Sequence, residues 1–170
     1  MMLAREGTSL PYELEFYEED GSEPVRDWLD GLTAHKRAAA MRALSIVLAD
    51  QGIGVAQSEF GKAVGGGLYE LRIRHSAQEI VEKFRPGMTA RLGPFPDDAV
   101  LLRVFFHPHG DRLILLVAAY DKGADPSEKR QQREIKIARK RLQAWRQGNR
   151  VGVVSARSFR NWWITQVRGR

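Results

Sequence analysis

Four cations and one tyrosine lie near the ends of three predicted strands. They are Arg72, Arg74, Arg103, Tyr120 and Lys122. Guanidinium groups bind phosphate through paired hydrogen bonds, and clustered cations stabilise negative charge that develops in a transition state. No obvious pair of acids accompanies them. These residue types predict a site for a polyanion, which we expect to be RNA.

The predicted strands bring these residues to one edge of a sheet. Their apolar and aromatic content predicts strands over residues 67–74, 101–106 and 113–120. In an antiparallel meander the end of the first strand lies beside the start of the second and the end of the third. A two-residue turn at His109-Gly110 or Gly110-Asp111 would place Tyr120 on the same face as Arg103.

A purely structural explanation of the arginines remains open. Side chains alternate along a strand, so Glu70 shares a face with Arg72 and Arg74. Arg72 and Arg103 would then pair with Glu70 or with other acids on an exposed face, without any role in catalysis.

If the site cleaves RNA without a metal ion, its residues have distinct expected roles. Arg72 and Arg103 would hold the phosphate and stabilise the charge of the transition state. Lys122 would add positive charge, or carry a proton if neighbouring cations lower its pKa. Tyr120 would stack on a base or assist proton transfer. Arg74 would contact RNA beside them.

The four histidines differ in their expected positions. His75 follows Arg74 at the cationic end of the sheet, so it is a further candidate RNA contact. His107 and His109 fall at the far end of the hairpin, where their proline and glycine neighbours predict a turn. His35 is expected on the surface of a helix.

The remaining segments predict an α+β domain in which two N-terminal helices pack on a small antiparallel sheet. A first strand is expected over 12–17, helices over 24–32 and 34–51, and a glycine-rich connector of turns up to Gly67. Two helical turns are expected over 77–84, within an otherwise irregular segment 75–99. The last helix runs to Trp145, with Asp125 as its cap.

Charge is concentrated in the C-terminal part of the chain. Residues 122–170 contain 14 Lys and Arg against three acids, whereas the rest of the chain carries a net charge of −5. A basic region of this density attracts phosphate backbones without regard to sequence. On the last helix, Lys129, Arg130 and Arg133 are the expected RNA contacts. The alternative is a solvated helix face with a frayed tail. The tail contains Val151–Val154 and Trp162-Trp163, and it is expected to form an extra strand and a turn of helix, or only to dock on a partner.

Several classes of protein are not expected. There is no cysteine, and no His, Asp or Glu spacing indicates a metal site, so neither a metal nor another cofactor is expected. No signal peptide or bilayer-spanning stretch of roughly 18 apolar residues is apparent. The expected protein is soluble and cytoplasmic.

Several segments, in order along most of the chain, resemble the phage Gp49-like/HigB family of RelE-type toxins. They are 12–17, Pro24-Val-Arg-Asp-Trp-Leu29, Gly67-Leu-Tyr-Glu-Leu-Arg72, Arg103-Val-Phe-Phe106 and Arg133-Glu-Ile to Leu142. The resemblance implies a RelE-like fold over residues 1–146 and a basic extension over 147–170. It also implies mRNA cleavage on the translating ribosome, and neutralisation by a helix-turn-helix antitoxin.

The family's site residues map onto Arg72, Arg103 and Lys122, and its helix glutamate onto Glu134, which is expected to orient a cation. The segment 75–99 is longer than the family's turn, which makes it a candidate lid, ribosome contact or antitoxin contact. Two rival classes remain: a non-catalytic RNA- or protein-binding module on the same fold, and a DNA-binding protein, which leaves the cationic sheet edge unexplained.

Overall fold

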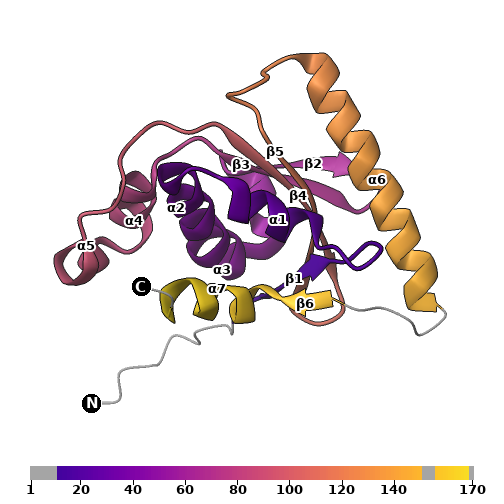
Figure 1. Cartoon of the computed structure of the whole chain (residues 1–170), viewed down its shortest axis with the longest axis horizontal. Coiled ribbons are helices and arrows are strands. Elements are labelled where there is room, and N and C mark those ends of the chain that lie inside the picture. The colour runs from indigo at the N-terminus through magenta and orange to yellow at the C-terminus, as the bar shows by residue number, and fades with distance from the viewer. Residues whose placement is uncertain (1–10, 151–155, 169–170) are drawn as a thin grey trace.

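The computed structural model describes residues 11–150 and 156–168 and shows a mixed α+β protein (Figure 1). Its sheet has six strands in the order β2-β3-β4-β5-β1-β6. The strands are β1 (Glu13–Tyr17), β2 (Gly61–Gly65), β3 (Leu68–Ile73), β4 (Leu102–His109), β5 (Leu113–Asp121) and β6 (Ala156–Ser158). The predicted meander is confirmed over β3, β4 and β5. The sheet is not purely antiparallel, however, because β1 covers the free edge of β5 in parallel.

The helical segments flank this sheet. They are α1 (Pro24–Gly31), α2 (Ala34–Arg42), η1 (Ala43–Leu48), α3 (Ala49–Gln51), η2 (Gly52–Gln57), α4 (Ala77–Phe84), α5 (Pro86–Leu92), α6 (Glu128–Arg150) and α7 (Phe159–Arg168). The predicted second helix is α2, η1 and α3 in succession, with a π-helical stretch at η1. Ser127 rather than Asp125 caps α6, because its Oγ accepts a hydrogen bond from the backbone N–H of Arg130 at 3.1 Å.

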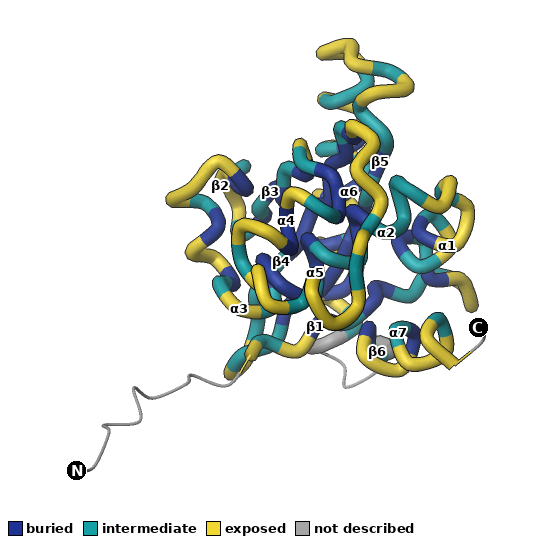
Figure 2. The backbone as a smooth tube through the Cα atoms, turned by 90° about the vertical axis from the view of Figure 1, so that its left-hand side faces the viewer, coloured by how far each residue is buried: buried dark blue, intermediate teal, exposed yellow. Residues whose placement is uncertain are grey.

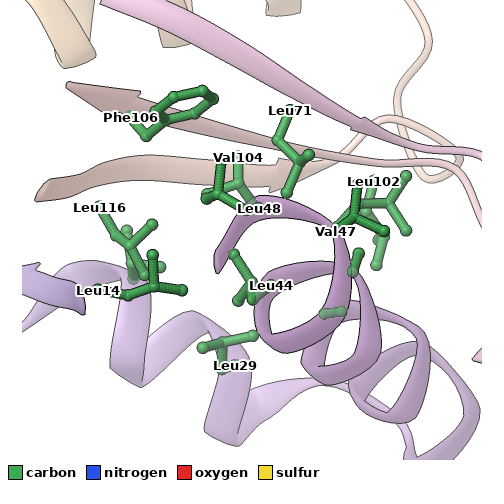
Figure 3. Close-up of a cluster of buried hydrophobic side chains, with 14 of the residues drawn as sticks. Leu14, Leu29, Leu44, Val47, Leu48, Leu71, Leu102, Val104, Phe106 and Leu116 are labelled. Atoms are coloured by element: carbon green, nitrogen blue, oxygen red, sulfur yellow. The ribbon is translucent and has the colours of Figure 1, made fainter. Parts of the chain in front are cut away.

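Two apolar clusters lie on opposite faces of the sheet. On one face α1, α2 and η1 pack their aliphatic side chains, such as Leu29 and Leu44, against Val104 and Phe106 (Figure 3). On the other face lies α6 (Figure 1), and its side chains Ala138, Leu142 and Trp145 belong to the second cluster. Figure 2 shows buried backbone at the centre of the molecule and exposed turns at its periphery. Arg72 of β3, Arg103 of β4 and Tyr120 of β5 belong to the face covered by α6.

Contrary to the expectation that no stretch could span a bilayer, the run Ala34–Gln57 is long and apolar enough to do so by length and composition. In the structure it is a core helix, since Leu44, Val47 and Leu48 are fully buried in the cluster shared with the sheet. Burial against a sheet accounts for its apolar composition.

Strand β2 lies where only glycine-rich turns were expected. Gly61 is paired with Leu71 of β3, and a Cβ at Gly61 would lie 2.7 Å from the backbone of Val55. The strand therefore requires a glycine where the backbone of η2 approaches closely. Gly66 and Gly67 do form the turn into β3, both with positive φ.

The β4–β5 hairpin reaches the predicted face relationship by a different route. His107 and His109 are part of β4, and the turn comprises the three residues 110–112 rather than two. Near the turn, the numbers of paired residues sum to an even value, as for His109 and Leu113. If this register continued along the hairpin, Tyr120 would lie on the face opposite Arg103. A bulge at Val117 inserts one residue into β5 and restores the odd register, so Arg103 pairs with Tyr120.

The two segments of uncertain role both pack on the domain. Residues 77–84 form α4, as expected, and Ser76 and Glu79 make a capping box at its start. The unexpected α5 follows. After α6, β6 pairs antiparallel with β1, and Phe159 and Trp162 of α7 enter the core. Val151–Val154 lies outside the described residues.

Candidate functional site

The five residues that suggested the site converge as expected. Arg72 of β3 lies opposite Arg103 of β4, and Arg103 lies opposite Tyr120 of β5. Lys122 follows β5 in a turn fixed to the start of β4, because the N–H of Gly123 donates to the carbonyl of Leu101 at 3.0 Å. The convergence follows from the meander and the bulge together.

Glu70 lies at the centre of this group. Its Oε1 is 2.8 Å from Nε of Arg103 and 3.4 Å from Nε of Arg72. The carboxylate side chain is 1 % exposed and that of Arg103 is 3 % exposed, so the pair is buried under the N-terminal part of α6. Removing two charges from water is costly unless each compensates the other. The structural alternative therefore holds for Arg103, although the face is covered rather than exposed.

Two expected roles are incompatible with this burial. Arg103 cannot reach a phosphate in this conformation, because its guanidinium is enclosed and Nη1 donates to the carbonyl of Leu102 at 3.1 Å. Tyr120 cannot stack on a base, because its ring packs against Phe105 and lies under the guanidinium of Arg130. Burial raises the pKa of Tyr120 further, so proton transfer by its hydroxyl is disfavoured. Arg103 and Tyr120 therefore belong to the buried layer on which the accessible residues of the site lie.

The accessible part of the site consists of Arg72, Arg74 and Lys122. The side chain of Arg72 is 24 % exposed, Arg74 is exposed, and Lys122 is partly exposed. Burial and the positive charge of Arg103 lower the pKa of Lys122, against the opposing charge of Glu70, and Arg72 and Arg74 lower it further. A lysine in such a field gives up its proton more readily than an ordinary one.

Gln131 of α6 bridges Lys122 and the buried carboxylate. Nζ of Lys122 donates to Oε1 of Gln131, and Nε2 of Gln131 donates to Oε2 of Glu70, each at 3.4 Å. Asp121, the neighbour of Lys122, forms an ion pair with Lys36 instead, in which Nζ of Lys36 is 2.5 Å from Oδ2 of Asp121. Lys122 is thus held by an amide and not by a carboxylate.

The three candidate RNA contacts of α6 divide into two kinds. Nε of Arg130 donates to Glu134 at 2.8 Å, so Glu134 does orient a cation of its own helix. Lys129 and Arg133 are exposed. They are available to a ligand, whereas Arg130 mainly covers Tyr120.

His75 lies at the cationic end but is held between two carboxylates. Nε2 is 2.8 Å from Glu59 and Nδ1 is 2.9 Å from Glu79, and Glu59 also accepts from Lys83 at 2.9 Å. Partial burial lowers the pKa of His75, but the hydrogen bonds to Glu79 and Glu59 outweigh it and raise the pKa overall. Its contacts identify it as a link between β3, α4 and Glu59 rather than as a free RNA contact.

We expect His75 to stabilise the fold only at low pH. When folding raises the pKa of a histidine, its contribution to stability is fully present below the pKa of the unfolded state, about 6.5. This contribution is lost as the pH rises through the pKa of the folded state. Glu59 and Glu79 are about half exposed, so solvent weakens their interaction with His75. At pH 6 the free energy of unfolding of wild type should therefore exceed that of His75→Asn by about 0.2–1 kcal/mol. Urea unfolding at pH 6 and pH 9 measures the difference, and a larger advantage at pH 9 would refute the assignment.

The other chemistry-bearing side chains lie elsewhere. His107 and His109 pack against Trp145, at the end of the hairpin away from Arg103, as the topology predicted. A groove of about 720 Å³ lies at that same end, lined by residues such as Tyr12, Phe159 and Trp163. It lies at the opposite end of the hairpin from Arg72, Arg103 and Lys122. Within the described ranges, no group of three or more His, Asp and Glu is placed to hold a metal ion.

Two residues that complete the site were not identified as such from sequence. Glu70 appeared only as a possible ion-pair partner, although its place on the face of Arg72 was a usable signal. Gln131 gave no signal, because its contact with Lys122 depends on the angle at which α6 crosses the sheet. No protein-family model, curated protein or solved structure matches this chain.

Proposed function

We propose that this protein is a metal-independent endoribonuclease of the RelE toxin type, acting on mRNA, with Arg72 and Lys122 as its catalytic residues. The observation that carries the proposal is the environment of Lys122. A partly exposed amine lies in the field of three arginines at the ends of neighbouring strands, and its pKa is lowered there. Glu70 offsets only one of these four positive charges, and an RNA strand would supply further negative charge.

The chemistry divides between the accessible side chains. The ribose 2′-oxygen attacks the adjacent phosphorus and loses its proton to water, while the bond to the 5′-oxygen breaks. Arg72 stabilises the charge on the phosphate oxygens, and the ammonium of Lys122 donates a proton to the leaving 5′-oxygen. The products are a 2′,3′-cyclic phosphate and a free 5′-hydroxyl. Glu70 and Arg103 position Arg72 and contribute to the field at Lys122.

The biological setting follows from the same proposal. A small enzyme with one candidate proton donor and no strong acid–base pair would depend on a large partner, such as the translating ribosome, to position the mRNA. A toxin of this kind would be neutralised by a helix-turn-helix antitoxin that covers the accessible cations.

A second candidate is a non-catalytic RNA-binding module. The burial of Arg103 and Tyr120 favours it, because two of the four residues expected to catalyse are enclosed. Such a module would bind RNA through Arg72, Arg74 and Lys122 and leave it intact.

Arg72→Ala separates the two candidates when it is compared with wild type in bacteria. We expect wild type to arrest growth and to create discrete 5′ ends on transcripts, and Arg72→Ala to reduce cleavage by about 10²–10³-fold. Arg160→Ala, an exposed arginine at the opposite groove, is the matched control and should behave as wild type. RNA that co-purifies with wild type without new 5′ ends would favour the binding module. Full toxicity of Arg72→Ala would reject this site.

A further inference from the structure

Four cations in the described part of α6 make no side-chain hydrogen bond or ion pair that would tie the helix to the rest of the fold. They are Lys129, Arg133, Lys136 and Lys140, and all four are exposed. No side-chain hydrogen bond or ion pair joins any of them to another residue within 11–150 or 156–168. Long cationic side chains left unbonded on a helix surface are available to a ligand.

The other described cations of this helix are used structurally. Arg130 pairs with Glu134, and Arg139 donates to the carbonyl of Val64 at 2.8 Å. Arg141 donates to Val117 at 3.1 Å, and Arg146 donates to Gly66 at 3.0 Å. Structural contacts thus explain some of the basic residues of α6, but they do not explain the four whose side chains are unbonded.

The unbonded cations form a single row. At 100° per residue they fall within an arc of about 60° on the side of α6 opposite the buried Ala138. Along the axis they follow one another at about 4.5–6 Å and span about 17 Å. No acid occurs between residues 135 and 150. Figure 1 shows that the sheet lies on one side of α6 only, so the row faces open solvent.

We infer that this row binds the sugar–phosphate backbone of the RNA substrate outside the cleavage position. The inference rests on the proposed function and adds the requirement that the substrate be a strand with several flanking nucleotides. Lys129 begins the row next to Arg130, whose guanidinium covers Tyr120 at the site. A strand leaving the site therefore passes the first turn of α6 and follows the row. One line of cations on a convex helix contacts one strand.

A triple variant tests the row against a control of equal charge. Lys129→Gln/Lys136→Gln/Lys140→Gln lowers the net charge from +6 to +3, and so does Arg91→Gln/Arg160→Gln/Arg168→Gln, at exposed arginines of α5 and α7. The probes are 2′-O-methyl oligoribonucleotides of about four and about sixteen nucleotides. These cannot be cleaved, since the attacking 2′-hydroxyl is blocked, so binding is measured whether or not the protein is a nuclease.

For the long probe we expect the row variant to raise Kd at least about tenfold and to reduce the slope of log K against log salt by about 2. The control variant should change either quantity much less, and the short probe should not distinguish the variants. Equal losses in both variants would attribute binding to net charge and overturn the inference. An unchanged Kd in the row variant would also overturn it, and would leave the row to an acidic protein partner. If binding depends on the row but wild type cleaves no RNA, the nuclease proposal is rejected and the assignment of the row as an RNA-binding surface is kept.

Discussion

Replacing Glu70 by alanine is expected to lower the free energy of unfolding by about 3–5 kcal/mol. Its carboxylate is the ion-pair partner of the buried Arg103 and also contacts Arg72. Without Glu70, the guanidinium of Arg103 would stay enclosed under α6 with no opposing charge, which is the costly way to break a buried pair. Urea unfolding of wild type and Glu70→Ala measures the loss.

Two further variants show whether the uncompensated charge is the cause. Glu70→Ala/Arg103→Met removes both charges and should recover most of the stability, because apolar replacement of a buried pair is often neutral. Glu13→Ala, at an exposed strand glutamate, should cost within about 0.5 kcal/mol. If Glu70→Ala costs no more than Glu13→Ala, or if the double variant is less stable than Glu70→Ala, the pair is not the stabilising feature.

This stability cost also governs how loss of activity is interpreted. A Glu70 or Arg103 variant that fails to arrest growth could simply be unfolded, so neither residue can identify the catalytic centre alone. Arg72 and Lys122 are partly exposed and lie above the buried pair. Their variants should fold, so loss of cleavage in them reports on the chemistry.

The position of the cations was predictable because it depends on short-range rules. Alternation along strands and antiparallel connection of neighbours bring Arg72, Arg103 and Tyr120 together. The predicted turn was wrong by one residue, and the bulge at Val117 compensated for it. No feature of the local sequence marks that bulge, so the correct face resulted from two deviations that cancel.

The burial of the site was not predictable from the same rules. Whether Arg103 is exposed depends on α6, which packs Leu142 and Trp145 across this face and carries Arg130 over Tyr120. Helix crossing angles are set by tertiary packing, which periodicity does not encode. Strand β2 was missed for a related reason, because glycine predicts turns unless the close approach of another backbone is known.

Replacing Lys122 by glutamine is expected to lower the rate of RNA cleavage by about 10²–10⁴-fold, the usual contribution of a general acid. Lys122→Arg keeps the positive charge but holds its proton too tightly to release it to the leaving oxygen. It should bind RNA like wild type and cleave it about as slowly as Lys122→Gln. Single-turnover cleavage, with binding measured separately on a 2′-O-methyl probe, distinguishes the two contributions.

The pH dependence of cleavage tests the role of the lowered pKa. If protonated Lys122 is the acid, the rate falls as pH rises through its pKa, and this fall begins at lower pH than for an ordinary lysine. Arg74 is one of the positive charges that lower this pKa. Arg74→Gln should therefore shift the alkaline fall to higher pH, whereas Arg168→Gln, at the far end of α7, should leave it in place. An unshifted profile in Arg74→Gln, or a Lys122→Arg enzyme as fast as wild type, would mean that Lys122 contributes charge and no proton.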